Sequence, residues 1–426
     1  MKMRTTLGGL LALAMLGGLV TTCAAADKKK DDSKYADVEK GYPENYWSVG
    51  FKFPPEVTEP WAVSDKDKRR RESTRRKPMA DVLVWTPPKA KKLRAVFLIP
   101  ANTDSKHIGE HSEVRKVAEK HEIGIVYLRN FGGKVIEWSD PPKMAEKGFA
   151  DMLALAAKWT GIEEYKHAPW IIMGKSSRGR FAFRPTWWFP DRVIASFSYH
   201  GETPTWPMPE WSKVKKDGQS VLHLAINGQD EWSGTWYRHV RPCMLNYHAN
   251  TDWLTHQVVL HGVGHGNYVD AHGSKGWGKP VPKDKISCLQ VWDYIALYMD
   301  KAMELRVPKD TYATKDKPVK LKQVDRSKGF LIHPRAPEEL LDMKWMAFRY
   351  SDGKYQTIPW PDEKHPVHAK EQGTIELDKI IRHATDVPED QREKFFWIGD
   401  RELLEAWFKL HNVNDLQGVL PEKKAK

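Results

Sequence analysis

The sequence has few cysteines, and this shortage excludes two classes of protein. Only three occur among 426 residues, too few for the disulfide framework that holds small secreted domains together. Their spacing also excludes a zinc site built from paired cysteines. One disulfide, between Cys243 and Cys288, stays open as a possibility.

Long apolar runs are equally scarce, and the one that occurs lies at the start of the chain. Residues 7–20 are apolar, follow a positively charged start and precede Ala24-Ala25-Ala26. This pattern predicts a signal peptide at 1–26, cleaved after Ala26. The run is short for a bilayer span and no second candidate follows, so we expect a secreted or periplasmic protein without a transmembrane span after cleavage. Cys23 leaves a lipid anchor as the alternative.

The charge balance lacks an acidic excess: the formal net charge is +12. Positive residues concentrate at 66–77 and near the C-terminus, and no recognisable nucleic-acid module accompanies them, so we expect no nucleic-acid partner. The run at 66–77 is interpreted as a solvated loop, with attraction to acidic polysaccharide or an anionic envelope as the alternative.

Strand-like and helical segments alternate along residues 44–306. We expect strands at 46–53, 81–85, 94–99, 123–128, 169–173, 193–200, 221–226 and 255–261, and helices at 112–121, 145–160, 284–303 and 401–411. The second and third strands are expected to form a hairpin. Alternation of this kind predicts a mostly parallel sheet covered by helices on both faces. A polar tether at 27–43 and a C-terminal extension or small subdomain at 307–426 complete the predicted organisation.

The segment PWIIMGKSSRG carries the candidate nucleophile. A serine raised on a sharp strand-to-helix turn needs small residues around it, and Gly174 stands two residues before Ser176. The matching position after the serine holds Arg178 instead of glycine. Ser177 is the alternative nucleophile, because Gly179 stands two residues after it.

Two further segments supply a candidate acid and base. Asp230 directly follows the strand at 221–226, where a buried carboxylate can orient a histidine, and Glu231 is the alternative acid. His265 follows the last strand on a glycine-flanked loop, and His261 is the weaker alternative. Serine, acid and histidine in this order, each after a strand, follow the order of α/β-hydrolases.

An oxyanion hole requires two backbone N–H groups that face the developing negative charge. One is expected from Ser177, the residue after the nucleophile. The other is expected from Ala101 or Asn102, in the loop after the strand at 94–99.

Residues 80–270 resemble the α/β-hydrolase superfamily, especially its secreted bacterial esterase-like branch. The resemblance rests on HAPWII, on GKSSRGRFAF followed by FPDRVIASFSYHGE, and on GVGHGNY. It implies an α/β-hydrolase fold, with a mostly parallel eight-stranded sheet and helices on both faces, plus a small C-terminal extension. It also implies serine hydrolase chemistry with no metal and no organic cofactor.

Tryptophan is abundant, with nineteen residues, and several lie in segments that follow the strands. Such aromatic side chains suit a surface for stacking sugars or aryl groups. The predicted substrate-binding residues are Trp206, Trp211, Trp232 and Trp236, together with Arg178 and Arg238 for an acidic substituent.

These observations predict hydrolysis of a carboxylic ester through an acyl-enzyme, on a small-molecule or polysaccharide ester, with sugar and aryl esters favoured. Two alternatives remain open. One is a non-catalytic carbohydrate-binding or envelope protein on a degenerate hydrolase fold, and the other is a serine peptidase.

Overall fold

Eight strands form one sheet in the computed structural model, in the order β1-β2-β4-β3-β5-β6-β7-β8. The structure describes residues 46–52, 79–100, 102, 105–129, 142–201, 220–228, 231, 236, 240–251, 253–260, 263–265, 286–337, 346–351, 354–359 and 380–411. The strands are β1 Tyr46–Lys52, β2 Met79–Trp85, β3 Ala95–Pro100, β4 Ile123–Arg129, β5 Trp170–Lys175, β6 Val193–Tyr199, β7 Leu222–Gly228 and β8 Leu254–Leu260.

Strands β3 to β8 run parallel, whereas β2 is antiparallel to both β1 and β4. Every residue of β3, β5, β6, β7 and β8 is buried, because helices cover both faces of a parallel sheet. This order and these directions are those of the α/β-hydrolase fold, as the sequence predicted.

The prediction that β2 and β3 form a hairpin is wrong. Strand β4 lies between them, and β2 pairs antiparallel with β1 on one side and with β4 on the other. Strand β3 instead pairs parallel with β4 and β5. Apolar composition marks both segments as strands, but it does not identify their partners, since those depend on contacts far along the chain.

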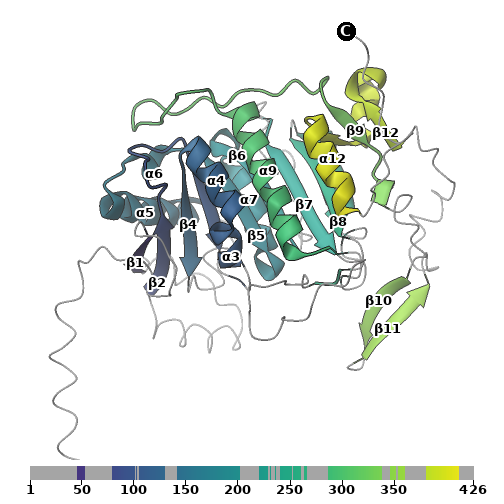
Figure 1. The fold of residues 1–426 in the computed structure, drawn as a ribbon, viewed down its shortest axis with the longest axis horizontal. Helices are drawn as coiled ribbons and strands as arrows, with labels where there is room; N and C mark the ends of the chain where they lie inside the picture. Colours follow the sequence, from purple (N-terminus) through teal and green to yellow (C-terminus); the bar gives the residue numbers. More distant parts are fainter. Residues whose placement is uncertain are drawn as a thin grey trace, which may run out of the picture.

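The helices divide between the two faces of the sheet (Figure 1). In this view α4 (Ser112–His121) and α9 (Cys288–Arg306) lie in front, and α5 (Pro142–Thr160) and α7 (Gly179–Trp188) lie behind. The other helices of this part of the chain are α3 Ser105–Glu110, α6 Glu164–His167 and α8 Arg241–Asn250. Helix α9 begins later than predicted, because Ser287 caps it by accepting a hydrogen bond from Gln290 N–H at 3.2 Å.

The C-terminal part forms a small second sheet and a helix that packs on the large sheet. The small sheet has the order β12-β9-β13, with β9 Phe330–Ile332, β12 Ile381–His383 and β13 Phe396–Ile398, and the helix is α12 Arg401–Leu410. Strands β10 Met346–Ser351 and β11 Lys354–Pro359 pair antiparallel as a separate two-stranded sheet. Trp407 Nε1–H donates to Gln257 O at 2.7 Å, and Val259 N–H donates to His411 Nε2 at 3.0 Å. These bonds occupy backbone groups of β8, the last strand of the sheet, and so protect its edge.

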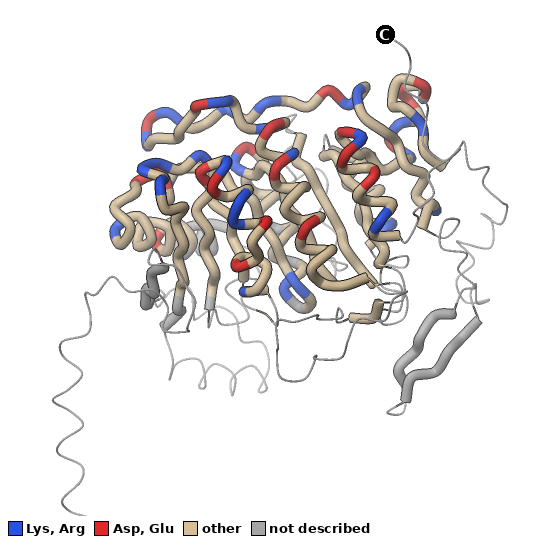
Figure 2. The backbone as a smooth tube through the Cα atoms, in the orientation of Figure 1, with Lys and Arg blue, Asp and Glu red and all other residues tan. Residues whose placement is uncertain are grey.

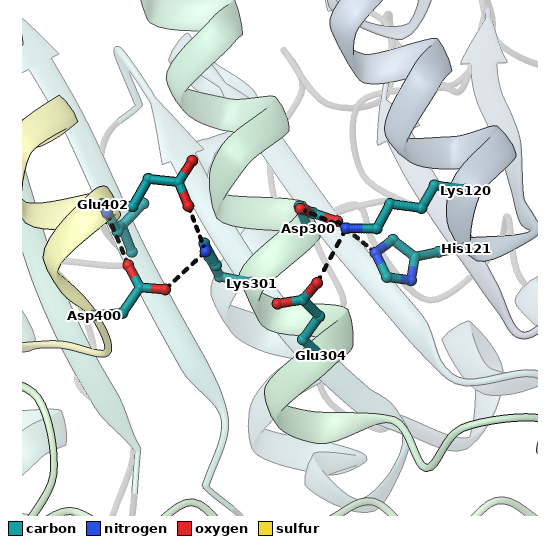
Figure 3. Close-up of polar contacts among 8 residues, drawn as sticks. Lys120, His121, Asp300, Lys301, Glu304, Asp400 and Glu402 are labelled. Carbon is teal, nitrogen blue, oxygen red and sulfur yellow. Dashed lines mark hydrogen bonds and ion pairs between the residues drawn. The ribbon is translucent and has the colours of Figure 1, made fainter.

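Charged residues of both signs occur along α4, α9 and α12, while the strands of the large sheet carry few (Figure 2). Two lysines connect these helices (Figure 3). Lys120 of α4 bonds Asp300 and Glu304 of α9 at 2.7 and 3.0 Å, and Lys301 of α9 bonds Asp400 and Glu402 at 2.9 and 2.6 Å. The connections therefore link three helices that lie side by side.

Cys243 and Cys288 are buried in α8 and α9, and no disulfide joins these two described residues. Within the described ranges, no helix is long and apolar enough to cross a membrane. The predicted signal peptide at 1–26, the tether at 27–43 and the basic run at 66–77 lie outside those ranges.

Candidate active site

Ser176 lies on a strained turn between β5 and α7. The strand ends at Lys175, a 3₁₀ turn covers Ser176–Arg178, and α7 starts at Gly179. The φ of Ser176 is +52°, in the left-handed region that ordinary residues avoid. Such strain persists where the surrounding structure enforces it, and it concentrates at functional sites. The turn therefore holds Ser176 beyond the carboxyl end of β5.

Close backbone packing explains which small residue this turn requires. A Cβ at Gly174 would lie 2.1 Å from the carbonyl oxygen of Arg178, so only glycine fits there. Arg178 itself has an ordinary negative φ of −96°, which any side chain tolerates. Its departure from the usual glycine pattern therefore leaves the turn intact.

His265 contacts the serine directly. The hydroxyl of Ser176 and Nε2 of His265 are 2.8 Å apart, the distance of a good O–H to N hydrogen bond. With Nε2 as the acceptor, the ring carries its proton on Nδ1. The side chain of His265 is 30% exposed, so a substrate can reach it from solvent.

A second glycine allows this loop to approach the sheet. A Cβ at Gly228, the last residue of β7, would lie 2.2 Å from Val263 O and 2.4 Å from Gly264 O. The loop that carries His265 therefore rests on the end of β7 backbone to backbone. This packing holds the imidazole beside the segment that follows β7.

Glu231 is the described carboxylate behind His265. Its side chain is 2% exposed, and Oε2 lies 3.9 Å from His265 Nδ1, longer than a hydrogen bond but within reach of one after a small movement. Asn227 Nδ2–H donates to Oε2 at 3.2 Å, Gly228 N–H donates to Oε1 at 3.0 Å, and His200 Nδ1 also bonds Oε1. The carboxylate is therefore fixed from several sides.

These contacts decide the charge of Glu231. Burial on its own would raise the pKa of the carboxyl, but the charge and hydrogen bond of His200 and the N–H of Gly228 lower that pKa to about 2. The side chain is consequently a buried carboxylate at neutral pH. A fixed negative charge here can stabilise an imidazolium at His265.

Asp230, the predicted acid, lies outside the described residues, and so does His261. Glu231, the predicted alternative, is the residue that the structure brings to His265. The structure therefore brings together Ser176, His265 and Glu231. All three follow carboxyl ends of parallel strands, namely β5, β7 and β8.

His200 is a member of this group that the sequence analysis missed as a site residue. It directly follows β6, is completely buried and contacts Glu231. Its ring centroid lies 6.1 Å from that of His265. In the sequence, Tyr-His-Gly at the end of β6 contributes only to the family resemblance, because a histidine at a strand end has no distinctive pattern.

The predicted oxyanion-hole residues are partly described. Asn102 follows β3, and its Nδ2–H donates to Lys175 O at 2.6 Å, so Asn102 lies beside the nucleophile turn. Ser177 belongs to the 3₁₀ turn at the start of α7, where N–H groups lack partners within the helix. Ala101 lies outside the described residues.

The predicted substrate-binding residues have different outcomes. Trp236 is 1% exposed, and the Arg241 guanidinium lies 5.8 Å from its ring centroid. Its large apolar indole therefore packs into the interior, and its role in binding substrate stays a prediction. Arg178 is partly buried in the nucleophile turn. The remaining four, Trp206, Trp211, Trp232 and Arg238, lie outside the described residues.

One group of possible metal ligands occurs in the described part of the chain, far from Ser176 in the sequence: His121, Asp300 and Glu304. In Figure 3 the Lys120 ammonium occupies the space between the two carboxylates, bonding Asp300 at 2.7 Å and Glu304 at 3.0 Å. A cation of the protein itself already neutralises this cluster, so the geometry assigns it no metal.

Comparison with known proteins gives distant structural likenesses. No protein-family model and no curated protein matches the sequence. Among solved structures, the chain is similar to an S-formylglutathione hydrolase from Agrobacterium tumefaciens (14% identity, 53% of this chain and 88% of that one, TM-score 0.35). It is also similar to an α/β hydrolase enzyme from a Medee basin deep-sea metagenome library (15%, 53% and 93%, 0.37). A third is a dienelactone hydrolase from Anabaena variabilis (10%, 54% and 92%, 0.32). Likenesses this distant say nothing about the activity of this protein.

Proposed function

We propose that this protein is a serine hydrolase that cleaves carboxylic esters through an acyl-enzyme. The observation that carries the proposal is the 2.8 Å contact between Ser176 Oγ and His265 Nε2, made by a serine whose φ is +52°. A strained serine that faces an imidazole nitrogen at the carboxyl edge of this fold is the arrangement of an activated nucleophile.

The residues have distinct roles in this reaction. Ser176 Oγ attacks the ester carbonyl carbon while His265 Nε2 takes its proton, and the imidazolium then returns that proton to the leaving alcohol. A water molecule, deprotonated by His265, hydrolyses the acyl-enzyme and releases the carboxylic acid. Backbone N–H groups at Ser177 and in the loop of Asn102 are proposed to stabilise the oxyanion.

Glu231 is proposed as the acid that orients His265. It is buried, ionised and 3.9 Å from Nδ1, which suits a group that keeps the proton on Nδ1 and stabilises the imidazolium. Asp230, which the sequence predicts as the acid, is the alternative to Glu231.

The substrate class and the location of the protein are further parts of the proposal. Trp206, Trp211 and Trp232 favour esters of sugars or aryl groups as substrates. The charged and apolar pattern at the N-terminus favours export. Replacing Trp206 with alanine should then reduce turnover of a feruloyl ester more than that of p-nitrophenyl acetate.

Sequencing the N-terminus of the protein recovered from its native host tests cleavage after Ala26 against lipidation at Cys23.

Labelling with a fluorophosphonate probe tests the serine chemistry. The probe reacts with an activated serine, so mass spectrometry should locate one adduct on Ser176, and the matched variant His265→Ala should label far more slowly. An unreactive wild-type protein, or an adduct elsewhere, would contradict the proposal and favour the non-catalytic alternative. Comparing aryl esters with peptide amides separates an esterase from a peptidase.

A further inference from the structure

The carboxylate of Glu231 is shared between two histidines. Oε1 bonds His200 Nδ1, while Oε2 faces His265 Nδ1 at 3.9 Å. Only His265 reaches Ser176. The second histidine thus contacts the acid on the side away from the nucleophile, a role that the hydrolase reaction described above does not use.

His200 is held in this place at a cost to its backbone. Its φ is +44°, in a region that only a few per cent of non-glycine residues adopt, histidine, asparagine and aspartate more often than the others. Among the described residues, four non-glycine residues have positive φ, namely Glu122, Ser176, His200 and Asp310. Two of the four are Ser176 and His200, so the strain in this part of the fold gathers at one site.

The strand next to His200 determines its direction. His200 N–H donates to Ile226 O of β7 at 2.7 Å, which extends the pairing of β6 with β7 by one residue. The positive φ of His200 then directs its imidazole towards Glu231. The ring is completely buried, so loss of its bond would leave a buried carboxylate with one donor fewer.

We propose that His200 is a positioning residue that sets the orientation of Glu231, and through it the orientation of His265. Its Nδ1–H occupies Oε1, together with Gly228 N–H, so that Oε2, which accepts from Asn227 Nδ2–H, faces His265. A carboxylate held in one rotamer keeps the imidazole aligned with Ser176 without further ordering during the reaction. This inference rests on the proposed serine hydrolase function.

Two polar replacements distinguish this role from simple filling of space. Asparagine places its amide Nδ2 where histidine has Nδ1 and also tolerates a positive φ, whereas glutamine places its amide one methylene farther out. His200→Leu removes the donor altogether. His223→Leu is the matched control, because His223 is another completely buried histidine, bonded through Nδ1 to Ser196 Oγ at 2.6 Å near the other end of β7.

The experiment measures the rate of fluorophosphonate labelling, and kcat and KM for p-nitrophenyl acetate. We expect His200→Gln and His200→Leu to lower kcat and the labelling rate by roughly 10- to 100-fold, with KM changed by about twofold or less, because binding of the substrate is intact. His200→Asn should recover both rates to within about threefold of wild type. His223→Leu should lower the melting temperature but label like wild type.

The outcomes separate this inference from the function on which it rests. Equal rates for His200→Asn and His200→Gln, or wild-type labelling of His200→Leu, would overturn the positioning role while leaving the hydrolase intact. An unreactive wild-type protein would overturn the proposed function itself. Should His200→Leu fail to fold, the comparison of asparagine with glutamine still decides, since both keep a polar side chain at this position.

Discussion

In the described part of the chain, the carboxylates around Glu231 and those along the helix surface have different surroundings. In the site, Glu231 is 2% exposed and accepts bonds from backbone and side-chain donors. Across α4, α9 and α12, the acidic partners Asp300 and Glu304 are 18% and 48% exposed. Buried charge must be matched by fixed donors, whereas exposed charge is also solvated by water and screened by salt. The first network therefore specifies geometry, and the second contributes little more than local stability.

The largest effect is expected from the nucleophile. Ser176→Ala should reduce kcat for short aryl esters by on the order of 10⁴-fold or more and leave the melting temperature nearly unchanged, because a small side chain is replaced on the same turn. Steady-state kinetics and a thermal melt measure the two quantities. Ser177→Ala is the matched control and should stay active. Loss of activity in Ser177→Ala alone would move the nucleophile by one residue.

The next effect is expected at the buried carboxylate. Glu231→Gln keeps the shape of the side chain but removes its charge, so kcat should fall by roughly 10²- to 10⁴-fold. Asp230→Asn, the adjacent control, should change kcat by less than about tenfold. The kinetics of both variants decide the assignment. Full activity in Glu231→Gln beside loss in Asp230→Asn would give the acid role to Asp230.

Acid titration should separate the buried network from ordinary carboxylates. The pKa of Glu231 is lowered from 4.5 to about 2 in the folded protein. The stability that its charge contributes is therefore complete above pH 4.5 and disappears as the pH falls through about 2. Urea denaturation of wild type and Glu231→Gln should give a larger difference in the free energy of unfolding at pH 5 than at pH 3. Equal differences at the two pH values would contradict the lowered pKa of Glu231.

The smallest effect is expected on the helix surface. Lys301→Met removes the bonds to Asp400 and Glu402 but keeps the apolar stem, so the free energy of unfolding should fall by about 1 kcal/mol or less. Adding about 1 M salt should remove most of that difference. Urea denaturation at two salt concentrations measures it, and Lys116→Met, whose side chain is 69% exposed, is the control for an isolated pair. If Lys301→Met lowered the free energy of unfolding by several kcal/mol independently of salt, these ion pairs would behave like the buried carboxylate network instead.

Much of the site was predictable because the relevant signals are local. Ser176 stands between a buried strand and a helix beside Gly174, and His265 stands after another strand beside Gly264, so both were identified from neighbouring residues. The choice between Asp230 and Glu231 was different. Adjacent acids look alike in sequence, and the contacts that mark Glu231 come from β7 and from His200 after β6.

The sequence by itself determined the alternation of strands and helices and the order of the serine, acid and histidine candidates, because periodicity and turn residues act over a few positions. Only the tertiary structure decided that β4 separates β2 from β3, that Trp236 is buried, and that His200 contacts Glu231. Each of these depends on segments far apart in the chain that meet only in the folded protein, where burial and hydrogen bonding select among residues that look equivalent in sequence.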